Sequence, residues 1–292
     1  MPSIDFLNKE IFQKCPQTFL KDLSTSHFIK NFLSQRKPVV IREGVQNWPA
    51  FNSWNNLSYF RNLQDLHEIP IEVYETPHVK FSVTNKKIVS FNKFWHKLLS
   101  TQEEDNTYYH SEGSIYLSPN KLGKLGILAK DIEIPSYIDP LFFEYSRLHF
   151  GKNTLTACHY HPQHDAFLCQ IVGKKRVILF PPYRNEFSCL YPHPWYSKLS
   201  NWSQIDFTNE NIYATYPNFL KVKPVECILE PGDMLFIPIY WWHLVYGENI
   251  SISVSNFWKA SRKDRYLTYL GLRSNYYWWF SKYLMKWAPM QK

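Results

Sequence analysis

The spacing of apolar residues divides the chain into a mixed first part and a strand-rich second part. In the first part, apolar side chains at helical spacing predict short helices over Ser24–Gln35 and Ser90–Leu99. The apolar run Lys37–Arg42 predicts a strand, and Asn47-Trp48-Pro49 marks a turn after it. The acidic segment Gln102–Asn106 is expected to form an exposed loop. A few helices are therefore expected to precede the main body of the fold.

From about Ser146 the pattern changes to short apolar runs separated by turn residues. The turns are signalled by Gly173-Lys174, Pro181-Pro182 and Pro231-Gly232-Asp233. Short strands at regular intervals are typical of an all-β sandwich or barrel and argue against βαβ units. The predicted strands are Ser146–Phe150, Ala166–Val172, Arg176–Phe180, Val225–Leu229, Met234–Pro238 and Ile250–Phe257.

The end of the chain, Arg262–Trp287, has a helical pattern that is dense in aromatic residues. An aromatic stripe at helical spacing usually packs in a core or an interface. We therefore expect this helix to pack on the barrel or to form a homodimer with a second copy of the chain. The alternative is a helix that lies in a membrane interface, with Arg273, Lys282 and Lys286 at its polar edge.

Composition and length are those of a globular protein with a full core. The 292 residues fit one large domain with a small appendage, which we assign to residues 1–260 and to the C-terminal helix in residues 261–292. The five cysteines are odd in number and form no C-x-x-C pair, which indicates a reducing, cytoplasmic compartment. The first residues lack the pattern of a signal peptide, and no run reaches the roughly 18 apolar residues of a transmembrane segment.

The net charge of +8 raises the question of an anionic partner. Because the basic residues are scattered and form no long run, a basic surface explains the charge best. We therefore expect no DNA partner. RNA stays open as a partner, although the sequence has no stacking motif that would support it.

Three histidines and a carboxylate lie within the segment Cys158–Asp165. Residues two apart on a strand share a face, so His159 and His161 are expected to converge. Asp165 follows four residues later, where a turn could bring it back toward them. A distant histidine, His243, follows an apolar strand and would complete a ligand set drawn from two strands. Imidazole and carboxylate ligands suit non-haem Fe(II) and, less specifically, Mn, Ni or Zn.

Motifs spread over roughly residues 30 to 260 resemble those of one known family. They are Pro38–Arg42, Asn47-Trp48-Pro49, Trp54, Thr156–His161, Gln170–Pro182, Cys189–Pro192, Ser203–Phe207, Tyr216–Phe219, Pro231–Asp233, Tyr240–His243 and Asn256–Trp258. The chain is similar to the JmjC/cupin-like hydroxylases, and among them to the asparaginyl hydroxylase that inhibits hypoxia-inducible factor. The resemblance implies a mainly β fold, a double-stranded β-helix (cupin or jelly-roll) barrel with flanking N-terminal helices. It also implies the use of Fe(II), O₂ and the co-substrate 2-oxoglutarate.

The resemblance implies roles for matching residues. His159 and His243 would be iron ligands, and Lys175 would pair with the distal carboxylate of 2-oxoglutarate. Further co-substrate contacts would come from Thr156, Tyr116 and Asn256. A dicarboxylate inside an apolar barrel needs a buried cation and hydroxyl donors, because an unpaired buried charge is costly. Candidate walls of the substrate pocket, which also suit the barrel core, are Tyr160, Tyr240, Trp241 and Trp258.

Position 161 departs from the family pattern, which is H-x-D or H-x-E. Three arrangements follow: a three-histidine site, the same site with Asp165 as a fourth ligand, or a site in which Asp165 replaces His161. The first hypothesis is an Fe(II)/2-oxoglutarate-dependent dioxygenase, a hydroxylase that oxidises an unactivated carbon of a protein side chain or small molecule. The alternatives are a three-histidine dioxygenase or isomerase without 2-oxoglutarate, and a non-catalytic metal-binding barrel.

Overall fold

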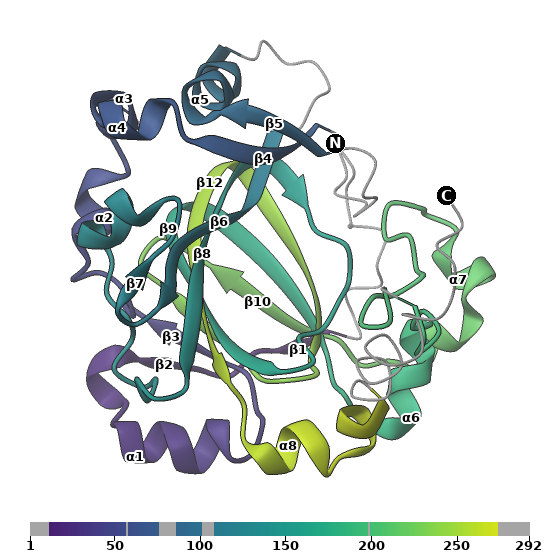
Figure 1. The fold of residues 1–292 in the computed structure, drawn as a ribbon. Helices are drawn as coiled ribbons and strands as arrows, with labels where there is room; N and C mark the ends of the chain where they lie inside the picture. Colours follow the sequence, from purple (N-terminus) through teal and green to yellow (C-terminus); the bar gives the residue numbers. More distant parts are fainter. Residues whose placement is uncertain (1–11, 57, 76–85, 101–107, 198, 274–292) are drawn as a thin grey trace, which may run out of the picture.

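The computed structural model describes residues 12–56, 58–75, 86–100, 108–197 and 199–273. Within these residues, twelve strands form one sheet that curves around a central space (Figure 1). The backbone path of the sheet is β2-β3-β11-β9-β12-β8-β6-β4-β5. The predicted mainly β architecture, a barrel with N-terminal helices beside it, is confirmed.

Three long strands make up most of the barrel wall. They are β8 (Phe143–Leu155), β9 (His164–Phe180) and β12 (Trp242–Lys259). Strand β12 pairs antiparallel with both of the others along nearly its whole length. The start of β9 and the end of β12 are therefore neighbours, because His164 lies opposite Lys259.

Shorter strands extend the wall on both sides. Strand β9 also pairs with β10 (Val225–Leu229) and β11 (Met234–Ile237). The remaining strands are β1 (Gln13–Lys14), β2 (Gln17–Phe19), β3 (Val39–Arg42), β4 (Pro70–Glu75), β5 (Lys86–Ser90), β6 (Tyr108–Ser118) and β7 (Lys121–Leu122). The predicted strand over Lys37–Arg42 is thus confirmed as β3.

Short helices flank the barrel. The predicted helix over Ser24–Gln35 is α1 (Thr25–Phe28), which continues as the π-helix η3 (Ile29–Leu33), and the one over Ser90–Leu99 is α5 (Phe91–Ser100). The other α-helices are α2 (Pro49–Ser53), α3 (Ser58–Asn62), α4 (Gln64–His67), α6 (Arg184–Phe187), α7 (Ile212–Thr215) and α8 (Arg262–Tyr266). Short 3₁₀ helices are η2 (Leu20–Asp22), η5 (Gly126–Asp131), η6 (Ser188–Leu190) and η7 (Pro217–Lys221).

The two faces of the wall bury different side chains. Phe167 and Val254 point outward into the cluster that packs under the N-terminal helices. Leu168, Val177 and Val245 point inward into a separate cluster inside the barrel. Residues directly opposite in a ladder share a face, so the register of β9 and β12 tells which side chains enter the barrel.

The predicted turn at Gly173-Lys174 is wrong, because β9 runs through these residues without a break. Gly173 has φ of +72°, and a Cβ at this position would lie 2.2 Å from the carbonyl oxygen of Ile250. Only glycine fits such a close approach of two strands at this φ. The inward face of β9 changes from even-numbered residues such as Leu168 to odd-numbered residues such as Lys175 at the register shift between Gln170 and Val172.

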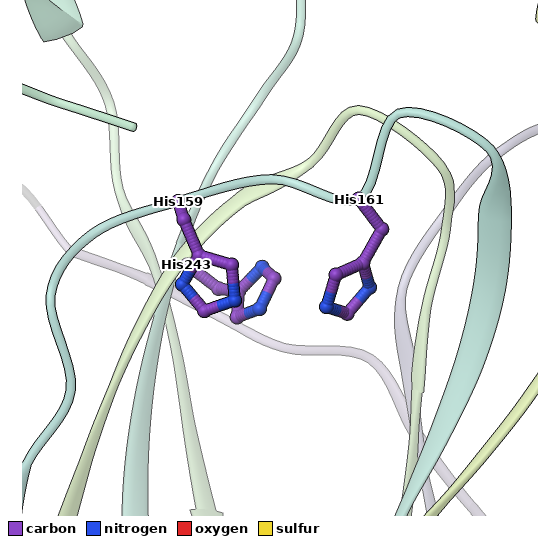
Figure 2. A group of neighbouring side chains, drawn as sticks. All are labelled: His159, His161 and His243. Carbon is purple, nitrogen blue, oxygen red and sulfur yellow. The ribbon is translucent and has the colours of Figure 1, made fainter. Parts of the chain in front are cut away.

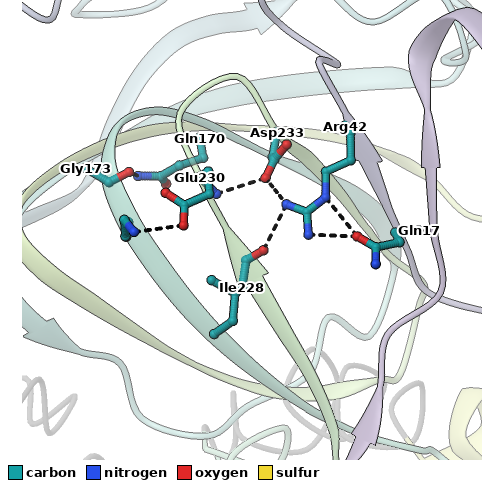
Figure 3. A network of polar contacts seen from close by, with 8 residues as sticks. Gln17, Arg42, Gln170, Gly173, Ile228, Glu230 and Asp233 are labelled. Atoms are coloured by element: carbon teal, nitrogen blue, oxygen red, sulfur yellow. Dashed lines mark hydrogen bonds and ion pairs between the residues drawn. The ribbon is translucent and has the colours of Figure 1, made fainter.

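The turn that leads into β11 is fixed by a polar network (Figure 3). Arg42 on β3 forms an ion pair with Asp233, and its guanidinium also donates to the Gln17 side chain and the Ile228 carbonyl. The Asp233 carboxylate accepts a further hydrogen bond from the Glu230 amide at 2.9 Å. The network therefore sets the start of the strand that leads to His243.

Most of the predicted C-terminal helix lies outside the described residues, which end at residue 273. The expectations of a dimer contact or a membrane-interface helix in residues 261–292 are therefore untested and stay predictions. Among the helices that the structure describes, none has the length and apolar character needed to span a bilayer.

Candidate metal centre

His159, His161 and His243 converge on one point at an end of the barrel interior (Figure 2). One ring nitrogen from each lies within 4.8 Å of the other two. The ring centroids of His159 and His243 are 4.3 Å apart, and those of His161 and His243 are 4.7 Å apart. The structure therefore brings together the three histidines that the sequence singled out.

The backbone places each of these rings. The amide of His243 donates to the carbonyl of His159 at 2.8 Å, and the amide of His159 donates back at 3.1 Å. This isolated bridge joins the loop before β9 to the start of β12. His161 lies beyond the bridge, where its carbonyl accepts from the Tyr240 amide at 3.2 Å and its ring contacts Phe257 with 5.0 Å between centroids.

Hydrogen bonds orient two of the three imidazole rings for metal binding. Nδ1–H of His159 donates to the Ala157 carbonyl at 2.9 Å, and Nδ1–H of His243 donates to the Trp241 carbonyl at 3.0 Å. Such bonds hold the tautomer in which Nε2 is the free lone pair. Nδ1 of His161 is buried and has no hydrogen-bond partner. The His161 nitrogen that faces the other two rings is Nε2 (Figure 2), so a metal at this point would be bound through Nε2 of His161.

Burial keeps the three imidazoles neutral. It lowers the pKa of His159, and it lowers the pKa of His161 and His243 much further, helped by the neighbouring histidines. Neutral imidazole is the form that binds divalent transition metals. The residues present therefore fit a mononuclear metal such as Fe(II).

Asp165 is not brought to this group. It lies opposite Trp258 in the ladder, one position before the inward-facing Ala166, and so it points to the outer face of the wall. Its Oδ1 accepts from the Ile239 amide at 2.8 Å, and Arg36 is the nearby cation that acts on its charge. The sequence alternatives in which Asp165 is a ligand therefore do not match this geometry.

Lys175 lies on the inner face of the barrel. Its side chain is 97% buried, and its ammonium group donates to the Ser253 hydroxyl. Burial lowers the pKa of Lys175 to about 7. Thr156 is also buried, but its hydroxyl accepts from the Val245 amide at 2.9 Å. Another threonine, Thr154, lies beside Lys175, since both would contact a Cβ placed on Gly247.

Tyr116 and Asn256 are not brought to the histidines. Tyr116 packs against the outer cluster, and its hydroxyl donates to the Ala129 carbonyl at 3.4 Å. Asn256 lies opposite Phe167 on the outer face, and its amide donates to Sγ of Cys169 at 3.6 Å. Neither is placed for the co-substrate role that the resemblance implied, since strand alternation turns both side chains outward.

The four predicted pocket walls belong to the core. Tyr160 and Tyr240 pack with Trp242 in a cluster at one end of the barrel. Trp241 lies in the inner cluster, where its Nε1 donates to the Arg36 carbonyl at 2.8 Å. Trp258 packs on Phe167 in the outer cluster, with 5.0 Å between ring centroids.

The inner face of the wall near the histidines also carries side chains that the sequence analysis did not single out. The inner face of β12 carries Ser253, Ser255 and Phe257, and β8 places His149, Arg147 and Tyr145 directly opposite them. Period-two alternation along the predicted strand Ser146–Phe150 would have placed Arg147 and His149 on one face. Which face is the inner one depends on the pairing partner and is not visible in that strand alone.

Comparison with known families now adds to this geometry. The family model of the cupin-like domain matches residues 25–264. The chain belongs to the cupin-like domain family. This match covers nearly the same residues as the motifs found in the sequence.

Curated relatives of this cupin-like chain carry JmjC names. Lysine-specific demethylase JMJ30 of Arabidopsis thaliana is 32% identical over 241 residues, which cover 81% of this chain and 53% of the relative. Jumonji C domain-containing protein 5 of Drosophila melanogaster is 29% identical over 266 residues, 89% of this chain and 63% of the relative. The chain thus spans about half to two thirds of the length of these relatives. The predicted JmjC/cupin-like membership is confirmed, and the narrower likeness to an asparaginyl hydroxylase stays a prediction.

A third relative has a different printed role. The human tRNA wybutosine-synthesizing protein 5 is 29% identical over 268 residues, which cover 87% of this chain and 81% of the relative. Cupin-like relatives of this chain therefore include proteins named for a protein modification and for a tRNA modification.

Proposed function

We propose that this cupin-like chain is an Fe(II)/2-oxoglutarate-dependent oxygenase that hydroxylates, or otherwise oxidises, an unactivated carbon. The observation that carries the proposal is the pairing of two features on one inner surface. Three neutral histidines surround a point that suits a metal, and a buried lysine lies on the same surface. In the described part of the chain, no carboxylate forms an ion pair with Lys175.

The distance between these two features suits 2-oxoglutarate. Lys175 contacts Ser253, and Ser253 lies four residues before Phe257, which contacts His161. Four residues of a strand span roughly 13 Å. Because the ammonium group already lies at Ser253, 2-oxoglutarate would cover this span together with its hydrogen bond to the ammonium group and its bonds to the metal.

The residues of the chain would divide the work. His159, His161 and His243 would hold the metal, and Lys175 would orient the dicarboxylate by a charge-assisted hydrogen bond. Bound Fe(II) with 2-oxoglutarate and O₂ would supply the oxidising chemistry. The rings of Phe257 and Tyr145, stacked with 4.7 Å between centroids, would exclude water from the side of the centre where Phe257 contacts His161.

The names of the relatives suggest the classes of substrate to consider. The name of the Arabidopsis thaliana relative indicates protein modification, and that of the human relative indicates tRNA modification. We propose a protein side chain or a small molecule as the substrate. RNA as substrate would require a basic, aromatic face for single-stranded bases.

Turnover without added substrate tests the proposal. The Fe(II)-loaded full chain should release succinate from 2-oxoglutarate in air, with O₂ consumed in step. His243→Ala should abolish this release, and Lys175→Met should raise the KM for 2-oxoglutarate at least tenfold. Absence of succinate from the wild-type chain, with iron bound, would contradict the proposal.

One observation favours a second candidate function. His161 supplies a neutral ligand where a carboxylate would be expected, so three imidazoles leave the full charge of +2 on the metal. A three-histidine dioxygenase or isomerase that does not use 2-oxoglutarate would fit this ligand set, as would a non-catalytic metal-binding barrel. O₂ consumption without succinate would indicate the first of these, and metal binding without O₂ consumption would indicate the second.

A further inference from the structure

A second cation lies on the inner wall beside the candidate metal centre. Arg147 on β8 is directly opposite Ser255 on β12, between the levels of Ser253 and Phe257. Its guanidinium carbon lies 4.7 Å from the ring centroid of Tyr145. Its Nε is buried and has no hydrogen-bond partner. Within the described residues, Arg147 is thus a half-buried cation that packs on an aromatic ring and whose Nε has no hydrogen-bond partner.

The guanidinium is directed toward the histidine end of the barrel. Tyr145, on which it lies, stacks on Phe257, and Phe257 contacts His161. The charge of Arg147 contributes to the lowered pKa of His161 and of His164. The pKa of Lys175 is lowered by burial alone. Arg147 therefore lies nearer to the metal point than Lys175 does.

Glu144, which lies three residues before Arg147 on β8, is already engaged. Glu144 forms ion pairs with His164 and with Lys259, the latter at 2.7 Å. These side chains become more exposed in the order His164, Glu144, Lys259, at 17%, 28% and 49%, which marks the outward direction. In the described part of the chain, no carboxylate is therefore left to neutralise Arg147.

A count of charges indicates what is missing. Three neutral imidazoles leave a divalent metal at +2, and Lys175 and Arg147 each add +1. 2-Oxoglutarate brings −2, so a charge of +2 would remain without an anion from the substrate. A buried cation without a partner is costly, and guanidinium groups bind carboxylates and phosphates through two parallel hydrogen bonds.

We propose that Arg147 binds an anionic group of the substrate, a carboxylate or a phosphate, next to the carbon that is oxidised. This inference rests on the proposed function, because it assigns 2-oxoglutarate to Lys175 and leaves Arg147 for the substrate. The residue acts as a specificity determinant, since a neutral analogue would leave the guanidinium buried and unpaired.

Small anions test the proposal directly. The full chain is loaded with Mn(II) and saturated with 2-oxoglutarate, and acetate and inorganic phosphate are titrated separately by calorimetry. The wild-type chain should bind at least one of them, and Arg147→Met should weaken that binding at least tenfold. Arg61→Met, which removes an exposed arginine on α3, is the matched control and should leave it unchanged. Preference for acetate identifies a carboxylate, and preference for phosphate identifies a phosphate group.

Several results would overturn the proposal. They are equal anion affinity in Arg147→Met and the wild type, no anion binding by the wild type, or a loss of 2-oxoglutarate affinity in Arg147→Met as large as that in Lys175→Met. The last would place Arg147 in the co-substrate pocket. If the wild type binds no 2-oxoglutarate, the proposed function fails, and the same titrations on the Mn(II)-loaded chain still decide the role of Arg147.

Circular dichroism checks that Arg147→Met is folded. If it is not, Arg147→Lys replaces it, because lysine keeps the charge but cannot form two parallel hydrogen bonds. This variant should bind the preferred anion at least threefold more weakly than the wild type. Equal affinity would contradict recognition by the guanidinium.

Discussion

The ring of His161 packs edge-on against the ring of Phe257, with 5.0 Å between centroids and 75° between planes. Phe257 points inward from β12, so this contact holds His161 on the inner side of the wall. Asp165, four residues along the chain, lies on the outer side. The two candidates for the same ligand position are thus separated by the wall itself.

Metal affinity should distinguish these two residues. His161→Ala removes one of three nitrogen ligands and should weaken Fe(II) or Zn(II) binding by roughly 100-fold or more. Asp165→Asn should leave the affinity unchanged, because the Asp165 carboxylate accepts a hydrogen bond from the Ile239 amide and does not face the metal point. Competition with a chelating dye measures both. Equal losses in the two variants would show that Asp165 is a ligand.

Asp165 should also lower stability at neutral and alkaline pH. Burial raises the pKa of its carboxyl from 3.8 to about 7, although the Ile239 amide and Arg36 act in the opposite direction. The folded chain therefore binds more protons than the unfolded chain between these values, and this contribution to stability falls as pH rises from about 4 to 7. Asp165→Asn removes the dependence and should be more stable than the wild type at pH 8 by about 1–4 kcal/mol.

Urea unfolding at pH 5 and pH 8 measures this difference. Asparagine keeps an oxygen that accepts from the Ile239 amide, so the variant should fold normally. If the gain in stability is the same at both pH values, the buried carboxyl is not its cause.

Binding of 2-oxoglutarate should weaken as pH rises. Burial lowers the pKa of Lys175 to about 7 in the free protein, so the amine is largely neutral above that pH. A carboxylate partner needs the ammonium form, so binding above pH 7 takes up a proton and the Kd should rise about tenfold per pH unit. Calorimetry of the Mn(II)-loaded chain in buffers of different ionisation enthalpy measures both effects. A Kd that is independent of pH from 7 to 9 would separate Lys175 from the co-substrate.

The crossing at Gly173 should tolerate no side chain. Gly173→Ala places a Cβ 2.2 Å from the Ile250 carbonyl oxygen at a φ of +72°. The clash and the left-handed φ together should lower the free energy of unfolding by at least about 2 kcal/mol. Thermal and urea unfolding measure the loss. Gly44→Ala is the comparison: its Cβ would lie 2.7 Å from Cβ of Met234 and 3.1 Å from the Ile41 carbonyl oxygen, but without a left-handed φ, so it should cost less.

The sequence predicted that His159 and His161 converge because the two residues are close in the chain, and it added the distant His243 from the apolar strand before it. His159 and His161 are two apart, and an isolated bridge pairs the first with His243. The motif with Lys175 also indicated a buried cation, and the structure places Lys175 inside the barrel. The spacing of His159 and His161 is visible in a single sequence, whereas the role of Lys175 was implied only by the family resemblance.

The face of each strand could not be predicted in the same way. Asn256 lies between Ser255 and Phe257, and a shift of one residue in the ladder would have turned it inward. The β12 pairings contain register shifts near Gly247 and Ile252, and the inward face of β9 changes between Gln170 and Val172. Long-range register decides such details, and for the same reason Arg147 read as an ordinary charged residue in a strand.

The most direct test of the account is an anaerobic titration of the Fe(II)-loaded chain with 2-oxoglutarate, followed by the metal-to-ligand absorption band. The wild type should develop the band and saturate at one 2-oxoglutarate per iron, while Lys175→Met should need at least tenfold more 2-oxoglutarate and keep its full iron content. An iron-loaded wild type that develops no band at any 2-oxoglutarate concentration would contradict the assignment of the three histidines and Lys175 to one active site.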